Sequence, residues 1–508
     1  MAETLVSAMV STPLAFLLAL LVTPLGVLLA FTPLVFLFLP ELRLRDRIAQ
    51  RREGVERELP FFSVVVNVLA GAGIPLYTIL LDMATSDMFP SIKQEALLVR
   101  RDVAIFGSNP NDSIERLASS HPSSRFGDFL LGYTSKARSG GDVASYLTGE
   151  SRSLLRGLEE DWARYVSRVG IVGSTMITAF GVVPLLLTVV GVFSPSFADA
   201  SLLVFTLVVV PSVAIALLSM AGRMQPVREE PIRGKAGRSI LVSLPGAFAA
   251  AFLGGFWASV GTASLIFFVA YGLSVRGQIA ETKAIEAGLA RFLKDLLEYK
   301  RQEYDLARAV LATQASTRYN NRFDRLLSRV ASQLKAGIPL DEVRVECRSK
   351  LGALGFLLLG QMSRSGGGTV DTVYQISSFA DRMTEMKKSA AIEIRPYVIL
   401  SYISPLLLAF GIAFVGGVLS SINRTARPVI AGLGASAAQV GASPVPLGQI
   451  SDLLIIVSAA ALGLISAKIT DFTVKNTLKA SVNVALAIAA VAAVSTMGSH
   501  SFLQGLGL

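Results

Sequence analysis

The chain has 508 residues, of which 52% are hydrophobic and 17% are charged, and it carries a formal net charge of +10. Soluble domains carry roughly 25% charged residues, so this composition favours an integral membrane protein with basic cytoplasmic loops over a nucleic-acid-binding protein. Cys347 is the only cysteine, which excludes an intramolecular disulfide framework. The apolar stretch after residue 10 is too long for a signal peptide and has no basic region before it.

Eight apolar segments are interpreted as membrane spans, since a helix needs roughly 20 residues to cross a bilayer. In chain order they are 12–40, 167–193, 201–221, 239–256, 259–275, 397–419, 449–467 and 479–497. The fourth and fifth spans are joined by a tight Gly-Gly-Phe-Trp turn. Taken in turn, the spans leave only Arg424 and Arg427 of the 47 Lys and Arg residues on the outer side. Because cytoplasmic loops retain these charges, we expect both termini outside and the charged domains inside.

This topology divides the chain into five parts. They are a span in 1–40, a cytosolic helical bundle in 41–166, four spans in 167–275 with a basic loop at 222–238, a second bundle in 276–396, and three spans in 397–508 with an external loop at 420–448. The apolar spacing is helical in both bundles, so the predicted fold class is all-α. Asn423 starts an Asn-Arg-Thr glycosylation pattern in the external loop, and its occupancy is left open.

Residues 60–81 are uncharged and long enough to resemble a further span. A span here would move the basic segment 82–166 outside and reverse every later loop. We therefore predict that 60–81 is helical and buried on all sides inside the first bundle.

The sequence also repeats itself. Residues 98–117 correspond to 326–345, and residues 129–147 correspond to 356–376. Each pair is followed by a span, which indicates two parallel units covering roughly 1–256 and 257–508. The counterpart of 60–81 is the charged helix 291–313, which has no Gly-x-Pro turn.

Two sets of residues are singled out in the bundles. Glycines and prolines that punctuate the helices predict structural turns at Gly71, Gly73, Pro75, Gly107, Gly140, Gly141, Gly337, Pro339, Gly367 and Gly368. Gly141 and Gly368 are the positions where we expect a positive φ. Basic residues that could dock a cytosolic partner are Arg100, Arg101, Arg322, Arg325 and Arg329. The last three recur at one face of a helix, although a solvated surface is the simpler interpretation for any one of them.

Little catalytic chemistry is visible. The two histidines, His121 and His500, are far apart, and no phosphate-binding loop of the G-x-x-x-x-G-K-[ST] type occurs. We therefore expect no metal, no cofactor and no enzymatic activity. The span interiors carry no central charge, which disfavours an ion-coupled carrier. A permease or flippase subunit remains the alternative, because unwound backbone can still bind a substrate.

The duplicated order of these motifs resembles the type II secretion system F-domain family. The residues that carry the resemblance are AGAGIPLYTIL (70–80) with AGIPLDEV (336–343), and SGGDVASYL (139–147) with SGGGTVDTV (365–373). No single motif is specific, but their repetition before each set of spans is. With two units in one chain, the sequence is most similar to the archaeal platform proteins of the FlaJ/TadC type, which serve archaella and archaeal pili.

The resemblance implies a mechanical adaptor in the cell membrane. Its expected partners are a cytosolic hexameric secretion ATPase, pilin-like filament subunits and membrane lipid, with no nucleic acid. The filament type, a homodimer and the choice of bundle that meets the ATPase all stay open.

Overall fold

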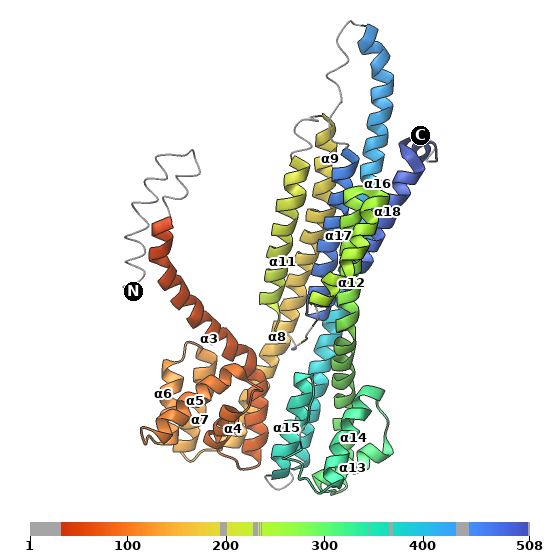
Figure 1. The fold of residues 1–508 in the computed structure, drawn as a ribbon. Helices are drawn as coiled ribbons and strands as arrows, with labels where there is room; N and C mark the ends of the chain where they lie inside the picture. The colour runs from red at the N-terminus through yellow and green to blue at the C-terminus, as the bar shows by residue number, and fades with distance from the viewer. Residues whose placement is uncertain are drawn as a thin grey trace. The chain divides into compact units, whose positions relative to one another are not determined.

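The computed structural model describes residues 32–193, 201–226, 236–343, 345–364, 369–432 and 447–505, together with Ile232 and Gly234. All regular structure in these ranges is helical (Figure 1). The chain divides into two compact units. Unit 1 comprises residues 1–156 and 361–372, and unit 2 comprises residues 157–360 and 373–508.

Unit 1 contains the first bundle. Its helices are α3 (Thr32–Gly71), α4 (Leu76–Thr85), α5 (Pro90–Ala104), α6 (Pro110–Ser120), α7 (Ser124–Arg138) and the start of α8 (Val143–Ile177). Its core includes the fully buried side chains of Phe62, Phe126 and Phe129. Phe62 and Phe129 meet edge to face with their ring centroids 6.3 Å apart, an arrangement that aromatic rings favour.

The apolar segment 60–81 is not one span. α3 ends at Gly71, the chain turns through Gly73 with φ +81°, and α4 starts after Pro75. Residues 62–69 are all buried. The prediction of a buried helix is therefore confirmed for 62–69 and wrong for 70–81, which are partly exposed and broken by the turn. The break follows from glycine's freedom to adopt a positive φ and from the preference of proline for a helix start.

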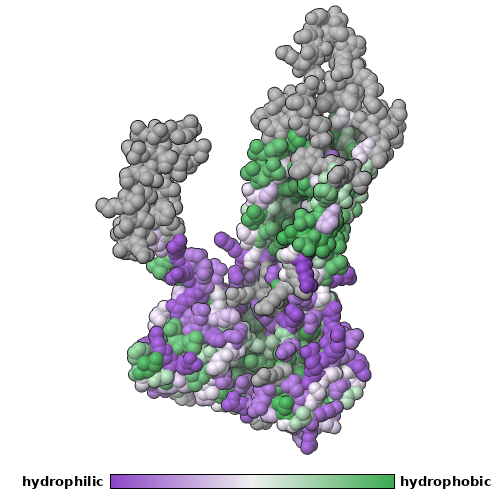
Figure 2. Space-filling view, in the orientation of Figure 1, coloured by the Kyte–Doolittle hydropathy of each residue, from purple (hydrophilic) through white to green (hydrophobic). Residues whose placement is uncertain are grey.

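Unit 2 contains the apolar helices. Its elements are the rest of α8, η1 (Thr178–Val182), α9 (Val183–Phe193), η2 (Phe205–Val209), α11 (Val210–Met224), α12 (Ala236–Arg301), α13 (Leu306–Ser316), α14 (Asn321–Lys335), α15 (Lys350–Arg364), α16 (Val370–Gly432), α17 (Leu447–Asp471) and α18 (Leu478–Gly505). In this unit, hydrophobic side chains cover α9 and α11, whereas hydrophilic ones cover α13 and α14 (Figure 2).

Six helical stretches among the described residues are long and apolar enough to cross a membrane. They are Val143–Val190, Ser201–Met224, Ala258–Arg301, Val370–Val418, Ile450–Asp471 and Leu478–Ser495, and Ala236–Ala251 is a shorter apolar helix. Six of the predicted spans overlap the long stretches and 239–256 overlaps the shorter one, whereas most of 12–40 lies outside the described residues. The chain is a multi-pass membrane protein.

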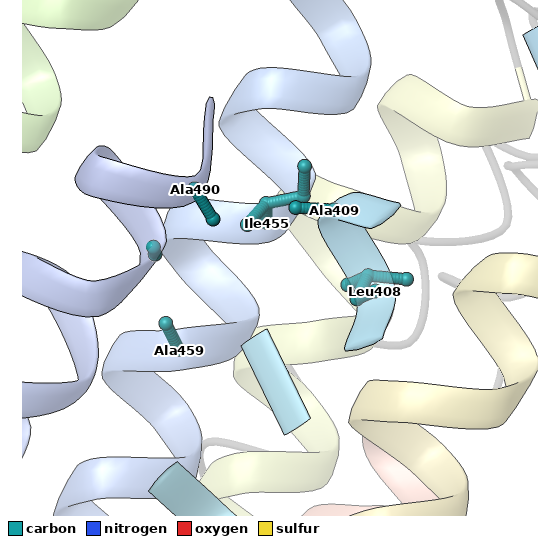
Figure 3. Close-up of a cluster of buried hydrophobic side chains, with 6 residues drawn as sticks. Leu408, Ala409, Ile455, Ala459 and Ala490 are labelled. Carbon is teal, nitrogen blue, oxygen red and sulfur yellow. The ribbon is translucent and has the colours of Figure 1, made fainter. Parts of the chain in front are cut away.

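α17 is the central helix of these stretches. In the apolar window of Ile450–Asp471, 78% of the residues are buried, against 17–33% in the other five. Small residues let its neighbours approach closely: Ile455 and Ala459 of α17 share a buried cluster with Ala487 and Ala490 of α18 and with Leu408 and Ala409 of α16 (Figure 3). Close packing through small residues is how helices associate in lipid, where apolar surface alone gives little driving force.

α12 reverses direction within its length, although its residues are helical throughout. A side chain on Gly246 would overlap Ile266, and one on Gly234 would overlap Tyr271. A straight helix would separate Gly246 from Ile266 by roughly 30 Å at about 1.5 Å per residue. The chain therefore doubles back between these residues, as the sequence predicts for the pair 239–256 and 259–275.

Two helices of unit 2 run from the second bundle into the apolar stretches. After its reversal, α12 continues as one helix to Arg301, and α16 continues from the bundle past Val418. α16 also extends to Gly432, so residues 420–432 of the predicted loop are helical, although Asn423, Thr425 and Pro428 are poor helix formers. Most of the rest of that loop, 433–446, lies outside the described residues.

The second bundle has a turn that the sequence did not predict. α12 ends at Arg301, and Glu303 follows with φ +66°. The backbone N–H of Glu303 donates to Lys300 O, and that of Tyr304 donates to Tyr299 O. Gly73 and Ile74 make the same pair of bonds to Ala70 O and Leu69 O. The Gly-x-Pro sequence is absent from 291–313 as stated, but the interpretation of this segment as a single helix is wrong, because glutamate occupies the left-handed position that glycine holds in the first bundle.

Replacing Glu303 by glycine should stabilise the second bundle. A left-handed non-glycine residue costs about 1–2 kcal/mol, and glycine's greater freedom in the unfolded chain returns part of that, so we expect a net gain of about 1 kcal/mol. Hydrogen exchange of the α12 and α13 amides in the full-length protein measures this local unfolding free energy. The control Glu298→Gly, inside α12, should lower it by about 1 kcal/mol. A loss of stability in Glu303→Gly would contradict the assignment.

The other predicted turns fall mostly where expected. Gly107 and Gly337 have φ of +64° and +87°. In the third turn, however, Gly140 has the positive φ of +66° rather than Gly141, whose N–H donates to Lys136 O and closes the end of α7. The prediction for Gly141 was thus one residue off. Gly71 ends α3 and Pro75 precedes α4. Pro339 O accepts a hydrogen bond from Glu342 N. Gly367 and Gly368 lie outside the described residues.

Candidate functional site

α14 carries the predicted cluster of three arginines on an amphipathic helix. Asn320 caps its start by accepting from Phe323 N at 2.9 Å, and Gly337 ends it. Phe323, Leu326, Leu327, Val330 and Ala331 are buried against the second bundle. Helical periodicity therefore places the polar residues of α14 on the face opposite these buried side chains. That polar face is the one available to a partner.

The three arginines are not equivalent. Arg325 and Arg329 are exposed, whereas Arg322 is half-buried and its Nη1 donates to Gly277 O on α12. Arg325 Nε donates to Asn321 O at 3.0 Å within its own helix. Arg329 borders a groove of about 260 Å³ that is also lined by Leu326, Val330, Gln333, Val345 and Glu346. We therefore define the α14 basic face as Arg325 and Arg329, with Arg322 holding α14 to α12.

Arg100 and Arg101 lie on α5 of unit 1, and both are exposed. Arg101 pairs with Asp102 at 2.8 Å, and its guanidinium lies 5.7 Å from the centre of the Phe106 ring. Ile105 and Phe106 are 71% and 67% exposed, beside the Gly107 turn. This apolar tip was missed in the sequence, although two large apolar residues directly before a turn glycine were a usable signal.

A buried ion pair fixes α5 to α3, and sequence reasoning did not find it. Glu95 is 2% exposed, and it accepts from Arg51 Nε at 2.8 Å and from Arg51 Nη2 at 2.6 Å. His121 Nε2 lies 3.6 Å from the same carboxylate. Burial by itself would raise the pKa of Glu95, but Arg51 and His121 outweigh it and hold that pKa below its ordinary value. His121 therefore has a place in the bundle core.

The start of α5 is held by the same helix. Phe89 precedes α5 and supplies no side-chain cap, but the Glu58 carboxylate accepts from Ser91 N and Ile92 N at 3.0 Å. A carboxylate at a helix N-terminus satisfies free N–H groups and is favoured by the helix dipole. α3 thus positions α5, and with it the exposed Arg100 and Arg101.

No group of three or more His, Cys, Asp or Glu side chains able to hold a metal occurs in the part of the chain that the structure describes. Asp452 and Lys479 lie near the ends of their apolar stretches, and in Val143–Val190 the charged residues stop at Arg168. The described residues thus combine long apolar helices with two helical bundles that carry many charged residues.

Comparison with protein families gives one match. Residues 62–191 match the family model of the type II secretion system (T2SS) protein F. The match covers the first bundle from within α3 and continues through α8 to α9. The comparisons with curated proteins and with solved structures gave no significant match.

Residues 62–191 are therefore similar to the T2SS protein F domain, and proteins of that family are non-catalytic platform proteins. Proteins of that family are membrane platforms of type II secretion or type IV pilus-like systems. The secretion machinery, including its ATPase, supplies the partners that this class implies.

Proposed function

We propose that this chain is the cell-membrane platform of an archaeal type IV pilus or archaellum assembly machine. It couples a cytosolic hexameric secretion ATPase to the insertion of pilin-like subunits into the filament. The observation that carries the proposal is the T2SS protein F match over residues 62–191, within a chain that has a second bundle followed by further spans.

A tandem repeat of that domain is part of the proposal, and the helix positions support it. α4 and α13 begin at residues 76 and 306, α5 and α14 at 90 and 321, α7 and α15 at 124 and 350, and α8 and α16 at 143 and 370. These starts differ by 226–231 residues. The left-handed turns at Gly73 and Glu303 obey the same offset.

The continuity of two helices supports mechanical coupling. α12 and α16 each join the second bundle to an apolar stretch without a loop. A helix is stiff along its axis, because each turn is tied to the next by backbone hydrogen bonds. A displacement of the second bundle by an ATPase would therefore reach the membrane helices directly.

A permease or flippase subunit is the second candidate. It needs polar groups at the membrane midplane around a substrate. The packed cluster of Leu408, Ala409, Ile455, Ala459, Ala487 and Ala490 instead favours close helix packing (Figure 3).

Deletion and complementation test the proposal. Cells that lack the chain should make no surface filaments and keep pilin-like subunits in the membrane, and the wild-type gene should restore the filaments. Filament counts by electron microscopy and subunit fractionation measure this. Normal filaments in the deletion strain, or loss of a small-molecule transport activity with filaments intact, would favour the permease.

The proposed topology predicts a labelling pattern. In a Cys347→Ser background, a cysteine at Ser328 on α14 should be protected from a membrane-impermeant thiol reagent in intact cells, because the bundle is cytoplasmic. A cysteine at Ser436, outside the described residues, should react. Reaction of the cysteine at 328 in intact cells would show that the second bundle faces outward.

A further inference from the structure

A cavity of about 320 Å³ lies in unit 2 where the apolar stretches end. It is bordered by α8, α12, α16, the residues after α11 and the connection between α17 and α18. Its apolar lining includes Trp162, Pro226, Ile232, Ile279 and Phe472. In the expected topology this level is the cytoplasmic surface of the membrane, where lipid headgroups lie.

Lysines are concentrated at this cavity. Lys283, Lys387 and Lys388 line it, together with the carboxylates of Asp471 and Glu286. The buried Asp471 is shared, since Lys283 Nζ lies 2.7 Å and Lys479 Nζ 2.9 Å from its oxygens. Lys387 pairs with Glu286 at 2.7 Å. These four lysines exceed the two carboxylates, so the cluster carries a net positive charge of two.

An unpartnered donor points to a ligand at the same place. Trp162 is 4% exposed, and its Nε1 is buried with no hydrogen-bond partner among the described residues. A buried donor without an acceptor is costly and rare in folded proteins. Trp162 lines the cavity, so an anionic oxygen that reached its Nε1 from there would supply the missing acceptor.

The wall of the cavity is strained at Phe472. This residue has φ +57°, which is uncommon for a bulky side chain. Its ring lies 5.3 Å from that of Trp162 and 5.9 Å from that of Tyr165, whose hydroxyl donates to Ile469 O at 3.0 Å. The connection between α17 and α18 is thereby held against α8, which fixes both an apolar wall and the indole N–H.

We propose that this cavity binds the phosphate headgroup of an anionic phospholipid. Lys283 and Lys388 meet the phosphate, the Trp162 N–H donates to one of its oxygens, and the apolar lining accepts the start of the acyl chains. Basic pockets between membrane helices on the cytoplasmic side are suited to such headgroups. The site goes beyond the platform function and does not depend on it.

The test uses purified full-length protein in detergent and its melting temperature. Added phosphatidylglycerol should raise the melting temperature by several degrees, whereas phosphatidylcholine should not. In Lys283→Gln/Lys388→Gln the shift should fall by at least half. This variant should still fold, because Lys479 continues to pair with Asp471. The matched control is Lys294→Gln. Lys294 lies on α12, as Lys283 does, and forms an exposed pair with Asp381 of α16, so this variant should keep the full shift.

Trp162→Phe is the second variant, since it keeps a ring in place but removes the N–H. It should also lose part of the phosphatidylglycerol shift. Equal shifts with the two lipids, or an unchanged shift in both cavity variants, would overturn the site. Glycerol 3-phosphate or inorganic phosphate giving the full shift would show a soluble ligand and overturn the lipid assignment. Defective filament assembly with an intact lipid shift would instead bear on the platform function alone.

Discussion

Replacing Glu95 by glutamine is expected to give the largest loss of stability in the first bundle. The change leaves Arg51 without its carboxylate, although the side chain keeps its size. Removing one partner of a buried ion pair costs about 3–5 kcal/mol, and we expect about 3 kcal/mol here because the Arg51 side chain is 40% exposed. Hydrogen exchange of the α5 and α7 amides in the full-length protein measures the local unfolding free energy.

The same pair predicts a dependence on pH. The pKa of Glu95 is held below its ordinary value of 4.5, so the stabilisation is fully present above that pH. It is lost as pH falls through the lower pKa of the folded state, because the unfolded chain then binds the proton more readily. In the wild type the local unfolding free energy should therefore decrease as the pH is lowered from about 4.5. In Glu95→Gln this part of the decrease should be absent.

Arg101→Gln is the matched control on the same helix. Its pair with Asp102 is exposed, so the change should alter stability by less than about 1 kcal/mol. An effect of Glu95→Gln as small as that of the control would mean that the ion pair does not hold α5 to α3.

The largest functional effect is expected from reversing the α14 basic face. In Arg325→Glu/Arg329→Glu, both changes lie on the exposed side of α14, and Arg322 keeps its contact with Gly277. Each exposed charge contributes little alone, about 0–1 kcal/mol, but a patch steers association at low salt. We expect filaments to be lost and the affinity for the cognate ATPase to fall by more than tenfold at low salt. The difference should shrink at high salt because charges are then screened.

Arg291→Glu/Arg308→Glu makes the same change of charge at two exposed arginines elsewhere in the second bundle. This control should keep its filaments. If both double variants behave alike, net charge rather than the α14 face matters. If Arg325→Glu/Arg329→Glu assembles filaments normally, the face is a solvated surface and the docking site lies elsewhere, with Arg100, Arg101 and Phe106 as the next choice.

The sequence predicted most of the helical architecture because its signals are local. The Gly73 and Pro75 turn explains why 60–81 forms two helices rather than one, and the Gly337 turn ends α14 as expected. Glu303 could not be found in this way, since glutamate is a good helix former and only the surrounding bonds hold it in a left-handed conformation. The end of α16 could not be predicted either, because the helix continues past Val418 to Gly432 although Pro428 favours an earlier stop.

The ion pair, the α14 basic face and the lysine cavity were predicted less completely, because their contacts join residues that are distant in sequence. Arg51 and Glu95 are 44 residues apart, and Lys283 and Asp471 are 188 residues apart. Periodicity placed Arg322, Arg325 and Arg329 on one face, but only the structure separates the half-buried Arg322 from the exposed pair. The lysine cavity needs several helices to meet at one level, which no local pattern encodes.

A binding measurement with purified components tests the central claim most directly. The full-length protein in lipid nanodiscs is titrated with the cognate secretion ATPase, and ATP hydrolysis is followed in the same samples. The account predicts saturable binding of the ATPase and no hydrolysis by the nanodisc protein alone. Hydrolysis without the ATPase, or no binding at low salt by a correctly folded protein, would contradict a non-catalytic platform that receives its motion from a separate motor.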